Sequence, residues 1–197
     1  MRKLVLGLVL AAGALTLWGC TTVSDAPTGA YQVGTAYQVT LGREWADVSR
    51  IMLDRSKSVH VLSIDGPLLN RLYLSEGIAS GDSMVTSHVK EKPTPTYKAD
   101  FSAQETVEFV ADSVSALDYD KVETSNLRPA KFGGIDAVRF DLAAKTKDGL
   151  DISGSAITAQ RQGQLFVILY LAPTEHYYGD GLPEVEAIMS SASFRGA

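Results

Sequence analysis

Leu165–Leu171, with the sequence LFVILYL, is apolar at every position. A strand without alternating polar residues is typical of the centre of a sheet that is covered on both faces. The chain also contains two segments with helical periodicity, one before and one after this stretch, and these can supply the cover. The stretch therefore predicts a layered α+β domain with a sheet between helices.

The first helical segment is Ser102–Leu117, which opens with the S-x-x-E spacing of a capping box at Ser102 and Glu105. Its apolar residues recur on one face: Val107, Val110, Ala111, Val114 and Leu117. The second segment is Gly179–Ser191, for which Asp180 is the expected N-terminal cap and Pro183 lies in the first turn. Its expected buried stripe consists of Leu182, Val185, Ile188 and Met189.

Short turns separate the strand-like runs that lie between the two helices. The runs are Lys121–Arg128, Ile135–Lys145, Leu150–Ala159 and Leu165–Leu171. Upstream, Tyr37–Leu41 alternates like a half-buried strand, and Val59–Ile64 with Leu68–Leu74 predicts a hairpin around Asp65-Gly66-Pro67. Ser75–Pro95 is interpreted as a long surface excursion. We expect an antiparallel sheet of about six to seven strands, sandwiched by two main helices in one domain.

The first residues have the layout of a secretory signal: Arg2 and Lys3, then the uncharged stretch Leu4–Gly19. The end of this stretch, Leu17-Trp18-Gly19-Cys20, resembles the lipobox of bacterial lipoproteins. The resemblance implies removal of residues 1–19 and attachment of a diacylglycerol and an acyl chain (palmitate) to Cys20. An ordinary cleaved signal and a retained membrane anchor are the alternatives. In a Gram-negative host, Thr21 after the cysteine favours transport to the outer membrane, with the domain facing the periplasm.

Composition narrows the choice of partner. Loss of Arg2 and Lys3 with the leader changes the net charge from −5 to −7, which argues against a nucleic-acid surface. Cys20 is the only cysteine, so its lipidation leaves no thiol for a disulfide or a metal. Residues 20–34 are small and polar and are interpreted as a flexible tether, which leaves 35–197 as the folded domain.

Few residues suggest a catalytic, metal-binding or ligand-binding site. No G-x-S-x-G motif is present, and the histidines, His60, His88 and His176, are dispersed along the chain. Glu175, His176 and Asp180 are metal-ligand types, but no distant partner is evident, and we expect neither a metal nor a cofactor. A candidate ligand pocket combines residues of the hairpin with residues of the loop after LFVILYL: Asp65, Arg71, Tyr73, His176 and Tyr177.

The order of these elements resembles the PsbP-like and LpqN-like families. In both, a final apolar strand and a loop lead into a helix and a terminal Ser-x-Phe, for which Ala192-Ser193-Phe194 is the counterpart here. The segment Ser63–Leu74, SIDGPLLNRLYL, is also similar to a group of bacterial lipoproteins of uncharacterised function. The resemblance implies a small antiparallel sheet between helices, on an exported and often lipid-anchored protein, and brings no catalytic motif.

These observations predict a non-enzymatic envelope lipoprotein, anchored through Cys20, that presents a PsbP-like domain to a protein partner. The alternative is a module that binds a small molecule or a lipid in the periplasm. A hydrolase that uses His176 with an acid is the remaining hypothesis.

Overall fold

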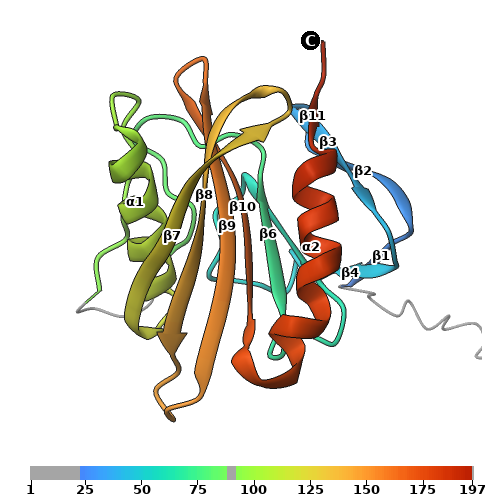
Figure 1. Cartoon of the computed structure of the whole chain (residues 1–197), viewed down its shortest axis with the longest axis vertical. Coiled ribbons are helices and arrows are strands. Elements are labelled where there is room, and N and C mark those ends of the chain that lie inside the picture. The colour runs from blue at the N-terminus through green and yellow to red at the C-terminus, as the bar shows by residue number, and fades with distance from the viewer. Residues whose placement is uncertain (1–22, 88–91, 197) are drawn as a thin grey trace, which may run out of the picture.

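The computed structural model describes residues 23–87 and 92–196, drawn in colour in Figure 1. Cys20, the signal-like stretch and His88 lie outside these residues. The large sheet is built from β1 (Ser24–Ala26), β4 (Trp45–Asp47), β5 (Val59–Ser63), β6 (Arg71–Ser75), β7 (Asp120–Phe132), β8 (Ile135–Lys145), β9 (Asp151–Arg161) and β10 (Gln164–Pro173). A small sheet contains β2 (Gly29–Val33), β3 (Tyr37–Leu41) and β11 (Ser193–Phe194). The helices are α1 (Ala103–Ala116) and α2 (Gly179–Ser191). The turn η1 (Thr174–Tyr178) leads from β10 into α2 and has non-helical backbone angles at Glu175 and His176.

The order of the large sheet is β1-β4-β5-β6-β10-β9-β8-β7, and all its described pairs are antiparallel. The sheet therefore has eight strands, more than the six or seven expected from the sequence. The three-stranded sheet β11-β3-β2 is an additional unit. Two of the strands in the large sheet, β1 and β4, have only three residues each, which is too short to show a periodic pattern.

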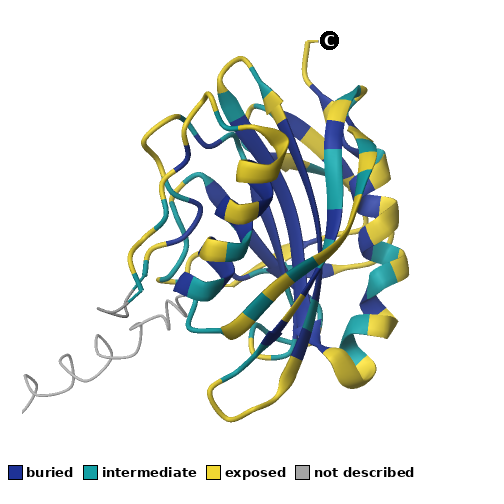
Figure 2. Ribbon diagram, turned by 60° about the vertical axis from the view of Figure 1, so that its left-hand side comes forward, coloured by how far each residue is buried: buried dark blue, intermediate teal, exposed yellow. Residues whose placement is uncertain are grey.

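β10 is the central strand that its composition predicted. Its side chains alternate between two separate hydrophobic cores. Phe166, Ile168 and Tyr170 lie in the core beneath α2. Leu165, Val167, Leu169 and Leu171 lie in the core beneath α1. Figure 2 shows the central strands buried and the outer parts of the molecule exposed.

α1 covers one face of the large sheet and confirms the predicted helix. Ser102 accepts from the backbone N–H of Glu105, and the Glu105 carboxylate accepts from the N–H of Ser102, so the capping box is complete. The helix buries Val107, Val110 and Val114 against the sheet. The connection before it also contributes to this core, because Ile78, Met84 and Val85 are fully buried. Ser75–Pro95 is thus not merely a surface excursion.

The other face is covered by α2 together with the small sheet, rather than by a helix alone (Figure 1). Residues 24–33, expected to belong to a flexible tether, form β1 and β2 instead. Val33 is fully buried and packs in the α2-side core. The folded domain therefore includes residues 24–33, because short strands gain stability from pairing that their own composition does not reveal.

α2 has the predicted bounds but not the predicted cap. The residue that precedes it, Tyr178, has helical backbone angles (φ −66°, ψ −49°) and makes no side-chain capping bond. The chain enters α2 directly from η1, so Asp180 lies within the first turn of the helix. None of the helices in the described part of the chain is long and apolar enough to cross a membrane.

The edges of the large sheet are poor templates for further strand pairing. β7, at one edge, contains Pro129 and two register shifts against β8. At these shifts Lys121 and Asn126 adopt positive φ angles of 51° and 53°. Bulges and proline on an edge strand interrupt its row of backbone hydrogen-bonding groups. β1, at the opposite edge, has only three residues.

Candidate functional site

The five residues of the predicted pocket do not converge. Tyr73 is fully buried in the α1-side core. Arg71 lies beside it, with its guanidinium 3.3 Å from the Tyr73 hydroxyl and 3.7 Å from an Asp54 carboxylate oxygen. Burial lowers the pKa of Arg71, but contacts with Tyr73, Tyr119 and Asp54 outweigh this effect and raise it above its usual value. Arg71 is therefore a paired cation at the edge of the core.

Asp65 has a local structural role in the turn of the β5–β6 hairpin. Its carboxylate accepts a 2.6 Å hydrogen bond from the Asn70 side chain. The Asn70 amide oxygen in turn accepts from the Ser63 hydroxyl and from the backbone N–H of Ile64. Asn70 is buried, so these bonds hold the turn closed.

His176 and Tyr177 lie in η1, which contacts the opposite face of the sheet from Tyr73. Tyr177 packs against the α2-side core, and its carbonyl accepts a 3.0 Å hydrogen bond from the Tyr170 hydroxyl. The His176 ring meets the Tyr177 ring edge-on at 5.0 Å. Within residues 23–87 and 92–196, His176 forms no hydrogen bond or ion pair with an acid. Tyr73 and Tyr177 thus lie in cores on opposite faces of the sheet, and no acid of the described residues pairs with His176.

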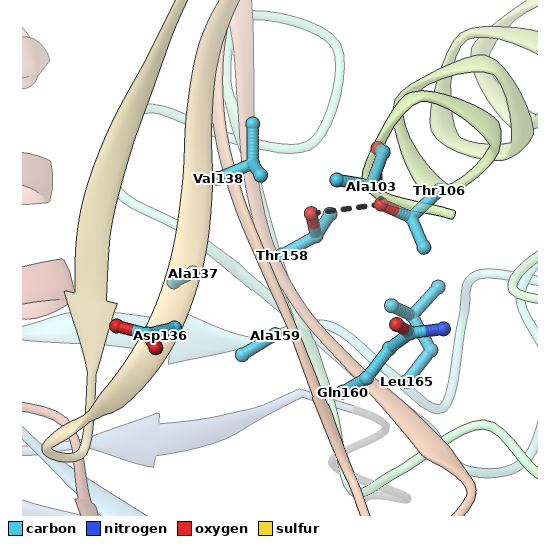
Figure 3. Close-up of a pocket in the computed structure, with 9 residues that line it drawn as sticks. All are labelled: Ala103, Thr106, Asp136, Ala137, Val138, Thr158, Ala159, Gln160 and Leu165. Carbon is cyan, nitrogen blue, oxygen red and sulfur yellow. Dashed lines mark hydrogen bonds between the residues drawn. The ribbon is translucent and has the colours of Figure 1, made fainter. Parts of the chain in front are cut away.

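A cavity of about 310 Å³ does open beside the N-terminus of α1 (Figure 3). We call it the α1 pocket. It is lined by Ala103 and Thr106 of α1, by Asp136–Val138 of β8, by Thr158–Gln160 of β9 and by Leu165 of β10. Sequence reasoning did not find it, because the pocket combines segments up to 62 residues apart and includes no motif.

Hydroxyl groups hold the walls of the α1 pocket together. The Thr106 hydroxyl donates to the carbonyl of Ala103 at 2.8 Å. Since a hydroxyl has only one proton, the 3.3 Å bond between Thr106 and Thr158 requires Thr158 to donate. Figure 3 shows this bond joining the helix to the sheet. Gln160 donates to the Tyr97 hydroxyl and to the Phe101 carbonyl, so it fixes the connection that leads into α1.

The chemistry available in the α1 pocket is that of a binding surface. Asp136, on its rim, is paired with Lys131 at 2.6 Å, and this bond lowers the pKa of the Asp136 carboxyl. Its lining is otherwise small, aliphatic or neutral and polar. Nucleophilic catalysis needs a nucleophile beside a base, and the lining residues do not include such a pair.

A cluster of four titratable side chains connects the two sheets. The Tyr31 hydroxyl of β2 donates to Asp47 of β4 at 2.9 Å and lies 3.1 Å from Nδ1 of His60 on β5. Nε2 of His60 is 2.7 Å from the Glu76 carboxylate. His60 lies in the run Val59–Ile64, which the sequence predicted to belong to a hairpin, and it is partly exposed on β5. The other three members of the cluster, Tyr31, Asp47 and Glu76, come from other strands and connections, so local spacing offered no signal for them.

The electrostatics of this cluster favour a structural role. Burial, contact with Asp47 and the hydrogen bond to Asp47 raise the pKa of Tyr31 well above its usual value. Burial raises the pKa of Asp47, but hydrogen bonds from Ser49 and Tyr31 outweigh it and hold that pKa below its usual value. Tyr31 therefore stays protonated and Asp47 ionised near neutral pH. In the described part of the chain, no group of His, Cys, Asp or Glu residues is arranged to hold a metal ion.

Comparison with known proteins shows the fold. No protein-family model and no curated protein matches the chain. Among solved structures, the cyanobacterial PsbP protein CyanoP from Synechocystis sp. PCC 6803 is 13% identical, with a TM-score of 0.54 over 93% of this chain and 98% of that one. The molecule is thus an α+β protein with a large antiparallel sheet and two helices. Its fold is PsbP-like.

Two further solved structures match less closely. One is PA94 from Pseudomonas aeruginosa, a protein of unknown function described as a putative regulator, at 14% identity, TM-score 0.46 and 84% and 96% coverage of the two chains. The other is LpqN, involved in cell envelope biogenesis of Mycobacterium tuberculosis, at 9% identity, TM-score 0.40 and 87% and 91% coverage. PsbP and LpqN, the two kinds of protein that the sequence pattern resembled, are therefore both among the matches.

Proposed function

We propose that the protein is a non-catalytic domain, anchored through a lipid on Cys20 to the periplasmic side of the outer membrane, that binds an envelope protein through its α1 pocket. The observation that carries this proposal is the position of β1. Its first residue, Ser24, follows Cys20 by four residues, and β1 forms one edge of the large sheet.

The α1 pocket lies toward the other edge. Six strand intervals separate β1 from β8 in the sheet order. At about 4.8 Å per interval, the two strands are about 29 Å apart. A lipid at Cys20 would therefore hold the β1 edge near the bilayer and leave the α1 pocket accessible from the periplasm.

The anchor is tested by the intact mass of the protein extracted from membranes, wild type beside Cys20→Ala. We expect a chain that begins at Cys20 and carries the added mass of acyl chains, and we expect this species to be lost in the variant. A soluble wild-type protein without added mass would contradict the anchor and would favour an ordinary cleaved signal.

Partner binding is tested by placing a photo-crosslinking amino acid at position 136, on the rim of the α1 pocket, in the anchored protein. Ala103 is exposed and lines the pocket, so Ala103→Trp should fill it and abolish the crosslink. Gln104→Trp is the matched control, because Gln104 is exposed but does not line the pocket. A crosslink that survives Ala103→Trp, or that forms equally from position 112 on the outer face of α1, would contradict binding at the pocket.

The volume of the α1 pocket favours one second candidate, a small-molecule module. About 310 Å³ lies at the lower end of the range for ligand pockets. Native mass spectrometry of the protein released from membranes tests this function. A bound mass that is present in wild type and absent in Ala103→Trp would favour it, and apo protein alone would count against it.

A further inference from the structure

The connection from β4 to β5, residues 48–58, presents two exposed apolar side chains next to the start of the described fold. Ile51 is 40% exposed and Leu53 is 80% exposed. Ser24 of β1 pairs with Asp47 of β4, so this connection starts one residue after the pair. The N–H of Ile51 donates to the Val48 carbonyl at 3.0 Å, which keeps Ile51 close to that edge.

Hydrogen bonds fix the shape of the connection. The Arg55 guanidinium donates to the carbonyls of Ser49, Ser56 and Val59 at 2.5, 2.9 and 2.8 Å. The Ser56 N–H donates to the Met84 carbonyl, and the Asp54 carbonyl accepts from Thr86. Leu53 is thus held outward by a braced loop, whereas Met52 beside it is partly buried and packs against the α1-side core.

The same loop exposes positive charge. Arg50 and Lys57 are both exposed. Within the loop, Asp54 is partly buried and faces Arg71, so the exposed charged side chains of residues 48–58 are both cations. A surface that combines exposed aliphatic side chains with cations matches the interface of a bilayer, where acyl chains lie beneath anionic phosphates.

Building on the lipid anchor proposed above, we infer that residues 50–57 rest on the bilayer surface, with Ile51 and Leu53 below the head groups and Arg50 and Lys57 against lipid phosphates. The short length of chain between the anchor and the fold favours the bilayer, rather than another partner, as the surface that this loop contacts. Four residues from Cys20 to Ser24 span at most about 14 Å when fully extended. The β1–β4 edge and its adjoining loop therefore cannot move far from the membrane surface.

The test uses tryptophan fluorescence in vesicles of phosphatidylethanolamine and phosphatidylglycerol with brominated acyl chains, which quench tryptophan at the acyl-chain boundary. Trp45 is the only tryptophan after the leader and is 1% exposed, so wild type sets the background. We expect Leu53→Trp in the lipidated protein to lose about half of its added fluorescence. Leu127→Trp is the matched control, because Leu127 is 45% exposed on β7 at the other edge of the sheet, and it should not be quenched.

A second arm separates failure of the loop from failure of the anchor. The chain that begins at Cys20 is expressed without the leader and coupled through its single thiol to a maleimide lipid in the same vesicles. This coupled chain tests the loop even if the native protein proves to carry no lipid. Absence of quenching for Leu53→Trp, or equal quenching for Leu127→Trp, would overturn the inference. It would then favour contact of the loop with a protein partner or with a second copy of the chain.

Discussion

The hydroxyl of Tyr31 on the small sheet donates a 2.9 Å hydrogen bond to Asp47 at the edge of the large sheet. This bond joins the two sheets at the place where the described chain begins. It also connects Asp47, through Tyr31, to His60 and Glu76. The cluster therefore fastens β2 onto β4 and β5, so its loss should weaken the attachment of the small sheet.

We expect Tyr31→Phe to lower the free energy of unfolding by about 1–2 kcal/mol, because the ring remains while its bond to a part-buried carboxylate is lost. Urea unfolding followed by circular dichroism measures the change. Tyr177→Phe is the matched control, because the Tyr177 hydroxyl makes no hydrogen bond in the described part of the chain. Equal loss of stability in the two variants would contradict the role of the bond.

Asp47 should make the free energy of unfolding depend on pH in the acidic range. Its pKa is held below the usual value in the folded state, so its contribution is fully present above the unfolded-state pKa and is lost as the pH falls through the folded-state pKa. We expect the urea midpoint of wild type to fall between about pH 5 and about pH 3, and to fall less steeply in Asp47→Asn. Parallel profiles for the two proteins would count against this assignment.

Gly181 permits the close approach of α2 to β10. A Cβ atom at this position would lie 2.2 Å from the Tyr170 hydroxyl oxygen, which donates to the Tyr177 carbonyl. We expect Gly181→Ala to cost about 1–3 kcal/mol, because either the helix or the tyrosine must shift. A Cβ atom at Gly179 in the same helix would meet no atom within 4 Å, so Gly179→Ala should be neutral or stabilising in thermal unfolding. Similar melting temperatures for the two variants would show that the contact is unimportant.

The capping box of α1 should make a measurable contribution to the free energy of unfolding. Ser102→Ala removes the acceptor for the Glu105 N–H and should lower stability by about 1 kcal/mol. Ser115→Ala, on a part-exposed position in the last turn of α1, is the control for replacing serine within this element. Chemical denaturation of both variants checks the difference, and a loss in Ser115→Ala as large as in Ser102→Ala would argue against the cap.

How far the sequence could predict each feature depends on how far apart along the chain the interacting residues lie. The capping box involves residues three positions apart, and it was predicted from spacing alone. The N-terminal cap at Asp180 was predicted by the same reasoning and was wrong, because Tyr178, the residue before α2, already has helical backbone angles. A cap requires a non-helical residue before the helix, and tertiary packing of the preceding turn decides that.

The candidate site was harder to predict than the fold. The Tyr73 side chain lies in the α1-side core, whereas Tyr177, next to His176, packs against the α2-side core, so the residues predicted for one pocket do not share one site. The Thr106–Thr158 bond of the α1 pocket spans 52 residues, and the Tyr31–His60 contact spans 29. Such contacts depend on strand order and register, and these cannot be predicted from the spacing of residues along the chain.

The sequence by itself determined that LFVILYL is a central strand, because side chains that are apolar at every position require cover on both faces. It also determined the two helices, since helical periodicity shows which face each one buries. The tertiary structure alone decided that residues 24–33 join the fold and that Tyr31 reaches Asp47. Short polar strands gain their stability from pairing with distant partners, and that gain becomes visible only when the partners are in place.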